Sequence, residues 1–306
     1  MKDAHGLIDR ITALTSPLAP KPTGIDPELA RLSDIHAVVF DVYGTLVISA
    51  SGDIGVSQQQ HTPDLARAAL AATGVDTASL PADFDGPAAL RAIIEASHQR
   101  SRAQGVEYPE VDILAIWREL LEANGLDLDE GTIRRIALEY ELRSNPVWPM
   151  PGLREVIAEL ARRGLVLGIV SNAQFYTPLM LHAFLGMDIA QAGFDLQCSA
   201  WSYREGVAKP STRIYEPVIA GLSSGHGIAP NQALYIGNDR RNDIWPAAEL
   251  GFRTALFAGD ARSLRQRHDD ARLAGVEPDR ILTDLMQITD ALIPEAPAPS
   301  PENGER

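Results

Sequence analysis

The first candidate for chemistry in this chain is a carboxylate that follows a short run of β-branched and aromatic residues. Asp41 comes directly after "HAVVF", residues 36–40, whose composition predicts a strand buried on both faces. Gly44 then permits a tight turn, and Thr45 can hydrogen-bond the backbone. A buried carboxylate is costly unless something compensates its charge. Asp41 therefore either caps the strand or acts as a nucleophile at the carboxyl end of a parallel sheet, where α/β proteins bind ligands.

Polar residues also follow two other apolar segments. Ser171 and Asn172 end "LVLGIVSN", Asp239 ends "NQALYIGND" with Asp243 four residues later, and Lys209 precedes a predicted helix in "GVAKPS". Taken singly, Ser171 and Asn172 are typical of a helix cap. Asp239 and Asp243 are typical of an acidic helix start, and Lys209 is typical of a solvated surface lysine. Because the carboxyl ends of parallel strands converge on one crevice, we expect a single polar cluster. Such a cluster offers hard oxygen ligands for Mg²⁺ and an ammonium for an anionic group.

The elements that position these residues alternate between strand and helix from residue 150 onward. Apolar segments such as "FDLQCSA" and "RTALFAG" are separated by helical patterns, which predicts right-handed βαβ units and a parallel sheet. Between Asp41 and residue 150 the pattern is helical. The fold class is therefore an α/β, doubly wound parallel sheet with an inserted helical cap domain. The predicted parts are an N-terminal arm 1–33, a core 34–50 and 148–290, a helical cap 51–147, and a disordered tail 291–306.

Two further expectations concern the arm and the environment of the protein. We expect the arm to be loosely attached, with two short helices around a proline-rich linker. The formal net charge of −14 argues against nucleic acid and anionic membranes as partners, although a local site can still bind a small anionic substrate. No apolar run is long enough to span a membrane, and the first residues lack the apolar core of a signal peptide. A single cysteine, Cys198, is typical of a reducing, cytoplasmic environment, and the oligomeric state cannot be read.

Four motifs in order, "FDVYGTL", "GIVSN", "AKPSTRIY" and "YIGNDRRNDI", give the chain a recognisable pattern. It resembles the haloacid dehalogenase-like hydrolase superfamily, in the group with a helical C1-type cap, over about residues 36–285. The resemblance implies a Rossmann-like core and Asp41 as the nucleophile of a covalent aspartyl-enzyme intermediate. It also implies that Ser171, Asn172 and Lys209 bind the reacting group, with Lys209 taking part in catalysis.

The resemblance further implies a metal site in the phosphatase branch of the superfamily. Its ligands would be Asp41, the backbone carbonyl of Tyr43, and the acidic motif of Asp239 and Asp243, with Mg²⁺ as the cofactor. The motif usually begins Gly-Asp, whereas this chain has Asn238 before Asp239, and we take Asp239 as the acid. The dehalogenase branch lacks the metal-binding acid.

Tyr43 is the second departure, because phosphatases of the superfamily usually carry an aspartate there as general acid. The "DxYGT" form resembles 2-haloacid dehalogenases, which expel a halide and need no proton donor. Replacement acids would be Asp53 or His98. Dehalogenases hold the haloacid carboxylate with an arginine soon after the first motif, where this chain has only Arg67, in a predicted helix, so no matching residue is identified. We expect a Mg-dependent phosphatase acting on a small phosphorylated metabolite. The alternatives are a metal-independent 2-haloacid dehalogenase, another reaction through the same aspartyl intermediate, and a non-catalytic binding or regulatory protein.

Overall fold

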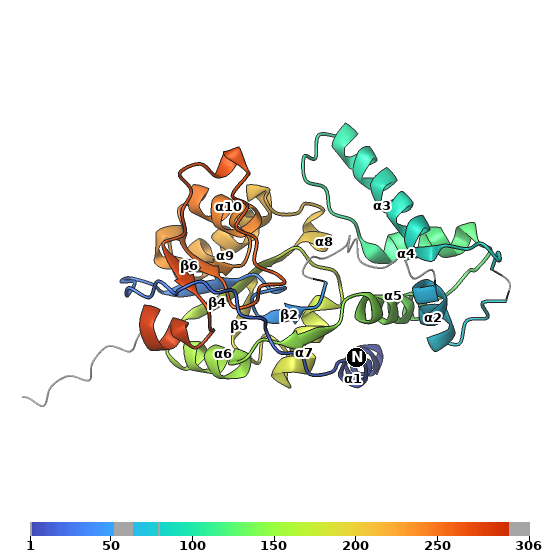
Figure 1. The fold of residues 1–306 in the computed structure, drawn as a ribbon, viewed down its shortest axis with the longest axis horizontal. Coiled ribbons are helices and arrows are strands. Elements are labelled where there is room, and N and C mark those ends of the chain that lie inside the picture. The colour runs from blue at the N-terminus through green and yellow to red at the C-terminus, as the bar shows by residue number, and fades with distance from the viewer. Residues whose placement is uncertain (1, 52–63, 79, 294–306) are drawn as a thin grey trace, which may run out of the picture.

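A six-stranded parallel sheet forms the centre of the protein (Figure 1). The computed structural model describes residues 2–51, 64–78 and 80–293. The strand order is β5-β4-β1-β6-β7-β8, and every neighbouring pair is parallel. The strands are β1 Ala37–Phe40, β4 Val166–Ser171, β5 Phe194–Trp201, β6 Ala233–Gly237, β7 Arg253–Phe257 and β8 Arg280–Leu282. The order reverses direction at β1, so Asp41 lies at the topological switch point of the sheet.

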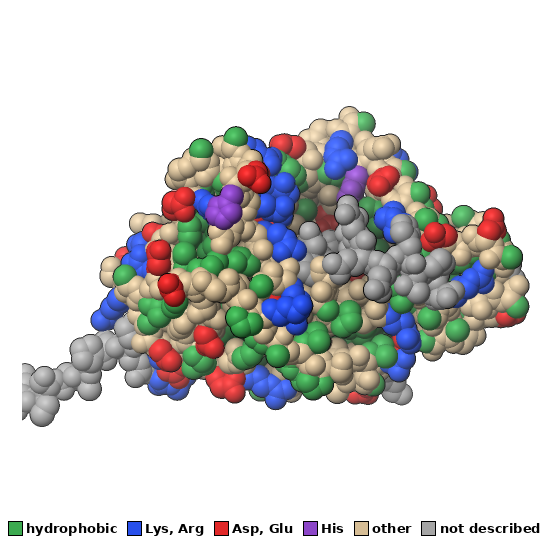
Figure 2. All heavy atoms as spheres, in the orientation of Figure 1, with side chains coloured by type: hydrophobic (Ala, Val, Ile, Leu, Met, Phe, Trp, Pro, Cys, Tyr) green, Lys and Arg blue, Asp and Glu red, His purple; other side chains and the backbone are tan. Residues whose placement is uncertain are grey.

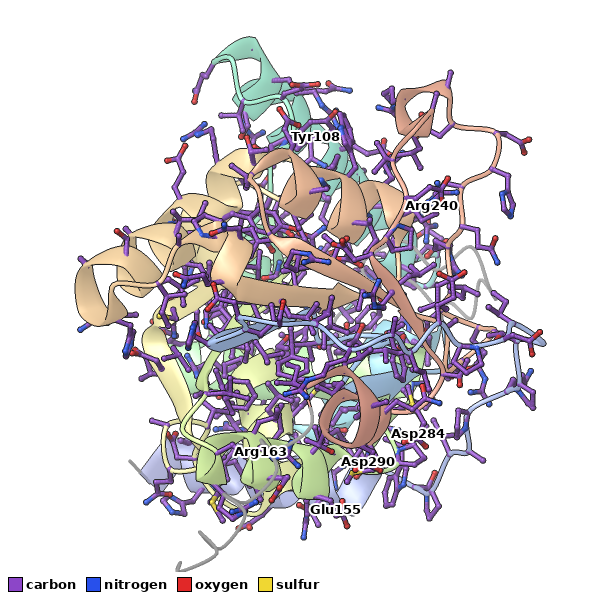
Figure 3. All side chains as sticks on the ribbon, turned by 90° about the vertical axis from the view of Figure 1, so that its left-hand side faces the viewer. Tyr108, Glu155, Arg163, Arg240, Asp284 and Asp290 are labelled. Carbon is purple, nitrogen blue, oxygen red and sulfur yellow. The ribbon has the colours of Figure 1, made fainter. Side chains whose placement is uncertain are left out.

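Both faces of this sheet are covered, which explains why its strands are almost continuously apolar. Val38 and Phe40 of β1 belong to one core cluster, and Ala37 and Val39 belong to the other. Helices α6 (Leu153–Arg162) and α7 (Thr177–Leu185) cover the first face, and α9 (Glu216–His226) and α10 (Trp245–Glu249) cover the second (Figure 3). The predicted doubly wound α/β fold is confirmed.

Four helices form a separate lobe beside the sheet (Figure 1). They are α2 Asp64–Ala72, α3 Gly86–Ala103, α4 Ile113–Ala123 and α5 Glu130–Ser144. An aspartate side chain caps the amino end of each of the last three, as the sequence pattern favours. All four helices fall within the range predicted for the cap. None of the helices in the described part of the chain is long and apolar enough to cross a membrane.

A short pair of antiparallel strands joins this lobe to the core. It pairs β2 (Val47–Ser49) with β3 (Val147–Pro149), so the chain leaves the core and returns to it at one place. Ser49 and Ser51 both donate side-chain hydrogen bonds to Asn145 Oδ1, at 2.8 and 2.9 Å. These bonds fix the end of α5 to the start of the lobe.

The N-terminal arm is more firmly attached than the sequence suggests. Helix α1 (Lys2–Leu14) buries Leu7 and Ile11 against α5 and α7, and Arg10 forms an ion pair with Glu139 of α5. The second helix expected in the arm, at "DPELARL", is absent from these described residues. Instead, the backbone of Glu28 pairs with Ile281 of β8, which protects the edge of the sheet.

The last described residues pack against α6. Arg163 at the end of α6 donates hydrogen bonds to the carbonyls of Thr289 and Ile293, and Figure 3 shows Arg163 beside Asp290 in this segment. The segment contains the short helix Ile288–Leu292, which buries Ile288 and Leu292. Most of the predicted disordered tail lies outside the described residues.

Candidate active site

The carboxylate of Asp41 lies immediately after β1 and is 6% exposed. Its backbone N–H continues the sheet by donating to the carbonyl of Ile236 at 2.9 Å. Its Oδ1 accepts a hydrogen bond from Ser171 Oγ at 2.9 Å and one from Lys209 Nζ at 2.8 Å. The structure therefore brings to Asp41 two residues that lie 130 and 168 positions away from it in the sequence, as the strand-end argument predicts.

Lys209 connects two buried carboxylates and is itself buried. Its Nζ donates to Asp41, to Asp243 Oδ1 at 2.5 Å and to the Tyr235 hydroxyl at 3.2 Å. Asn172 holds the backbone of Lys209 from both sides, because its Oδ1 accepts from Lys209 N–H and its Nδ2 donates to the Lys209 carbonyl. Asn172 thus positions the lysine that contacts the candidate nucleophile.

The protonation of this cluster follows from burial and from the neighbouring charges. Burial alone would lower the pKa of Lys209, but the carboxylates of Asp243 and Asp41 outweigh it and raise this pKa. Burial raises the pKa of Asp243 to about 6, with Lys209 opposing the shift and Asp41 and Asp239 adding to it. The ammonium therefore stays charged and is the cation that compensates Asp41.

Tyr235 belongs to this cluster although the sequence gives no sign of it. Its hydroxyl donates to the carbonyl of Val170 at 3.0 Å and lies 3.1 Å from Asp243 Oδ1. A tyrosine in the middle of a buried strand looks like any other core aromatic residue. Only the position of β6 beside β1 in the sheet shows that its hydroxyl helps to orient Asp243.

Asp239 is placed differently from the other two carboxylates. Its Oδ1 caps the helical turn Arg240–Ile244 by accepting from the backbone N–H groups of Arg241 and Asn242. The guanidinium of Arg267 binds the same carboxylate through both oxygens, with the shorter distance 2.6 Å from Nη2 to Oδ2. Both oxygens of Asp239 are therefore engaged by donors of the protein. Sequence reasoning missed Arg267, although the basic run "ARSLRQR" is conspicuous in so acidic a chain.

Other oxygens in the site remain available to a cation. Asp41 Oδ2 and the backbone carbonyl of Tyr43 accept no hydrogen bond from the residues that the structure describes. Asn238 Oδ1 accepts one long bond, 3.4 Å, from the hydroxyl of Thr45. All three residues line the same pocket. A carboxylate, a carbonyl and an amide oxygen are ligands that suit Mg²⁺, so the site fits this ion, with Asn238 rather than Asp239 offering the spare oxygen.

A different trio in the described ranges has a closer arrangement of metal-binding atoms. Ligand atoms of Asp195, Cys198 and His226 lie within 4.8 Å of one another, which the three carboxylates of the predicted metal site do not. The trio lies on β5 and at the end of α9. His226 Nε2 already contacts Asp195 at 2.7 Å, and burial raises the pKa of the Cys198 thiol to about 12. Asp195 and His226 therefore form a hydrogen-bonded pair, and the neighbouring Cys198 thiol is protonated.

The hydroxyl of Tyr43 contacts helix α7 and does not contact the Asp41 carboxylate. The hydroxyl lies 2.9 Å from Thr177 Oγ1 and contacts Met180 Sδ, both in α7. Burial, followed by the nearby charge of Glu141, raises the pKa of Tyr43 well above its ordinary value. The phenol is therefore neutral and packed against a helix, which is not an arrangement for donating a proton at Asp41.

We expect Tyr43→Phe to change turnover little, because the hydroxyl that it removes points toward Thr177. The loss of this buried hydrogen bond should lower the free energy of unfolding by about 0.5–1.5 kcal/mol. Steady-state kinetics and urea unfolding of the purified variant measure both effects. A drop in turnover of about a hundredfold in a folded variant would give the phenol a chemical role after all.

Two glycines let the backbone pass close to the site. Gly44 has φ 82°, and a Cβ there would lie 2.5 Å from Ser263 Cβ and 2.6 Å from Asn238 Nδ2. A Cβ on Gly237 would lie 2.3 Å from the carboxyl carbon of Asp243. The turn predicted at Gly44 is present, and both positions exclude a larger residue without movement of the pocket wall.

Two adjoining cavities meet at the site. The smaller one, 90 Å³, contains Asp41 and is lined mainly by polar groups, among them Asn172, Lys209, Asn238, Asn242, Ser263 and Arg265. The larger one, 270 Å³, lies between the helical lobe and the core, and Asn172 lines both. On the face shown in Figure 2, Lys and Arg side chains gather along the boundary between core and lobe. Local positive charge thus accompanies the net negative charge of the chain.

The structure places two of the remaining candidates, His98 and Arg67, away from the pocket around Asp41. His98 on α3 lines the larger cavity and not the smaller one, and burial lowers its pKa. Arg67 on α2 donates to the carbonyls of Thr77 and Pro81 and lines neither cavity. Asp53 lies outside the described residues.

Comparison with known proteins identifies the family of this chain. A sequence model of the haloacid dehalogenase-like hydrolases matches residues 35–251, well over half of the chain. The chain belongs to this family of hydrolases. No curated protein matches it.

Solved structures with similar folds include both kinds of hydrolase that the sequence leaves open. The 2-haloacid dehalogenase of Pseudomonas syringae pv. Tomato DC3000 is 20% identical, with a TM-score of 0.53, and the match covers 83% of this chain and 96% of that one. A HAD phosphatase from Thermococcus onnurineus is 18% identical, with a TM-score of 0.48 and the same coverage. At 20% identity the likeness to the Pseudomonas syringae structure shows the fold alone and does not establish which reaction this chain catalyses.

Proposed function

We propose that this hydrolase is a phosphatase in which Asp41 attacks the phosphorus of a small phosphate monoester. The observation that carries the proposal is the polar character of the 90 Å³ pocket around Asp41. Lys209 touches the carboxylate and Arg265 lines the same pocket, so an anionic group would meet positive charge and amide donors there. A carbon–halogen bond gains little from such surroundings, whereas the phosphoryl oxygens need them.

In the proposed reaction the carboxylate of Asp41 forms a bond to phosphorus as the ester P–O bond breaks. The leaving alkoxide takes a proton from water. Water then attacks the phosphorus of the aspartyl phosphate and loses its proton to the solvent, which releases phosphate and restores the Asp41 carboxylate. Lys209 would stabilise the charge that develops on the phosphoryl oxygens, and Ser171 would hold the Asp41 carboxylate in position. Asn172 would act by fixing the backbone of Lys209.

We propose Mg²⁺ as the cofactor, held by Asp41 Oδ2, the carbonyl of Tyr43 and Asn238 Oδ1. When bound, the ion would neutralise phosphoryl oxygens. Asp41 is the one carboxylate among these three proposed ligands, because the Asp239 carboxylate is already bound by Arg267. Mg²⁺ sites of this kind depend on substrate phosphate to complete their coordination, so we expect weak binding of the ion in the absence of substrate.

The position of Tyr43 gives the proposed phosphatase a further property. Because its phenol faces α7, no acid stands at the usual place to protonate the leaving group. We therefore expect aryl and acyl phosphates to react faster than simple alkyl phosphates, since good leaving groups need less protonation.

A screen with p-nitrophenyl phosphate, acetyl phosphate, an alkyl phosphate and 2-chloropropionate tests these expectations. Each compound is assayed with Mg²⁺ and, in parallel, with EDTA. We expect phosphate release that requires Mg²⁺ and no chloride release. Full activity in EDTA together with chloride release would favour the 2-haloacid dehalogenase, and no turnover of any compound would favour a binding or regulatory protein. We also propose a reducing, cytoplasmic location, because Cys198 is buried and has no disulfide partner.

A further inference from the structure

The larger cavity is the place where the substrate beyond the reacting phosphoryl group would lie. It is 270 Å³, and Asn172 connects its wall with that of the smaller pocket around Asp41. Its apolar wall comes from the helical lobe and includes Leu90 and Ile94 of α3 and Trp117 of α4. A cavity that combines an apolar wall with polar groups at fixed places is typical of a site that selects an organic ligand.

Glu141 is the polar group in this cavity that needs an explanation. It lies near the end of α5, where its Oε2 accepts from the Tyr176 hydroxyl at 2.9 Å and its Oε1 accepts from Asn145 Nδ2 at 3.2 Å. Among the described residues, no Lys or Arg forms an ion pair with it. Burial raises the pKa of Glu141, because a carboxylate without a cation is unfavourable there.

Another carboxylate in the same wall serves as a contrast. Glu110 Oε1 accepts from the Val111 N–H and from Gln174, and Oε2 accepts from the Ser202 hydroxyl. These bonds join the lobe to the core, so the burial of Glu110 has a structural reason. Among the residues that the structure describes, Glu141 has two neutral hydrogen-bond partners, one on each oxygen, and it therefore keeps capacity for a ligand.

Aromatic rings stand beside Glu141 in the cavity wall. Tyr140, Tyr176 and Trp117 all line the cavity, and the rings of Trp117 and Tyr140 are in edge contact with centroids 5.4 Å apart. The indole N–H of Trp117 is fully buried and has no hydrogen-bond partner among the described residues. A half-buried carboxylate beside aromatic rings is an environment that attracts a cation.

We propose that this cavity binds a positively charged nitrogen on the leaving group, with the Glu141 carboxylate as its counter-ion. The substrate is then a phosphate monoester of an amino alcohol. This inference rests on the proposed phosphatase function. The ester oxygen would lie between the two cavities, with the phosphoryl group beside Asp41 and the nitrogen beside Glu141. Arg91 on α3 lines the same cavity and repels a cation, so the nitrogen lies at the α5 end beside Glu141.

Two esters that differ in one group test the proposal directly. In 2-aminoethyl phosphate an ammonium replaces the terminal methyl group of n-propyl phosphate, so size and shape are matched. We expect the wild-type enzyme to show a kcat/KM for the amino ester higher by about tenfold or more. Glu141→Gln keeps the shape of the side chain but removes the charge, and should lower this ratio severalfold, to the part that comes from the better leaving group of the amino ester. Glu122→Gln, on the exposed side of α4, should retain it.

The possible failures are distinguishable. Equal kcat/KM values for the two esters in the wild-type enzyme would overturn the inference, and this comparison holds even if Glu141→Gln does not fold. A Glu141→Gln variant that is folded by thermal unfolding and slows both esters equally would overturn it too, because the carboxyl would then serve the reaction and not the nitrogen. In both cases hydrolysis of p-nitrophenyl phosphate shows that the phosphatase function stands. Absence of turnover with all three esters would instead overturn the proposed function, and this inference with it.

Discussion

Asp41→Asn is expected to abolish turnover while leaving the protein folded. The amide can still accept hydrogen bonds from Ser171 and Lys209, but it is a poor nucleophile and cannot form the aspartyl intermediate. We expect kcat with p-nitrophenyl phosphate to fall more than about a hundredfold, as it does when a nucleophile is removed. Steady-state kinetics on freshly purified protein measure this fall, and circular dichroism and thermal unfolding verify the fold.

Ser49→Ala is a useful companion variant, because it also removes a polar group from the wall of the same pocket without touching Asp41. Its hydrogen bond to Asn145 belongs to the connection between the lobe and the core, so a modest loss of stability is expected. If Asp41→Asn kept more than about a hundredth of the wild-type rate, the covalent role of Asp41 would have to be abandoned.

Lys209→Met is expected to produce the second large effect, and it should appear in both stability and activity. The substitution keeps the length of the side chain but leaves Asp41 and Asp243 buried without their cation. Removing one partner of a buried ion pair typically costs about 3–5 kcal/mol, and we expect a loss of this order in the free energy of unfolding. Urea unfolding followed by fluorescence measures this loss. Turnover should fall as well, because the phosphoryl oxygens lose their nearest positive charge.

The chain offers a matched control in Lys21→Met, since Lys21 is exposed. This variant should differ from the wild type by no more than about 0.5 kcal/mol. Adding Asp243→Asn to Lys209→Met should recover part of the lost stability, because it removes one of the two unpaired carboxylates. Wild-type stability in Lys209→Met would mean that the buried carboxylates do not depend on Lys209.

The grouping of the main candidate residues could be predicted because it follows from topology. Once strands and helices alternate, polar residues at strand ends must meet at one edge of the sheet, and Asp41, Ser171, Lys209 and Asp243 do so. The pairing of Asp239 with Arg267 could not be predicted in the same way. It depends on the path of an irregular loop, and no periodicity in the sequence fixes where such a loop returns.

The attachment of the N-terminal arm shows a similar limit. The spacing of Leu7 and Ile11 suggests an amphipathic helix, but only the structure reveals that α5 and α7 together form the surface on which it packs. The antiparallel strand pair that joins the lobe to the core was also not predicted, because its strands have three residues each and a run this short has no readable alternation.

Trapping the covalent intermediate tests the role of Asp41 most directly. The enzyme is mixed with p-nitrophenyl phosphate and Mg²⁺, quenched in acid during the first turnovers, and reduced with borohydride, which converts an aspartyl phosphate to homoserine. Peptide mass spectrometry then identifies residue 41. We expect homoserine at this position in the wild-type enzyme and none in samples prepared without substrate. Unmodified Asp41 in samples that have released phosphate, with the modification at another carboxylate or at none, would contradict Asp41 as the nucleophile.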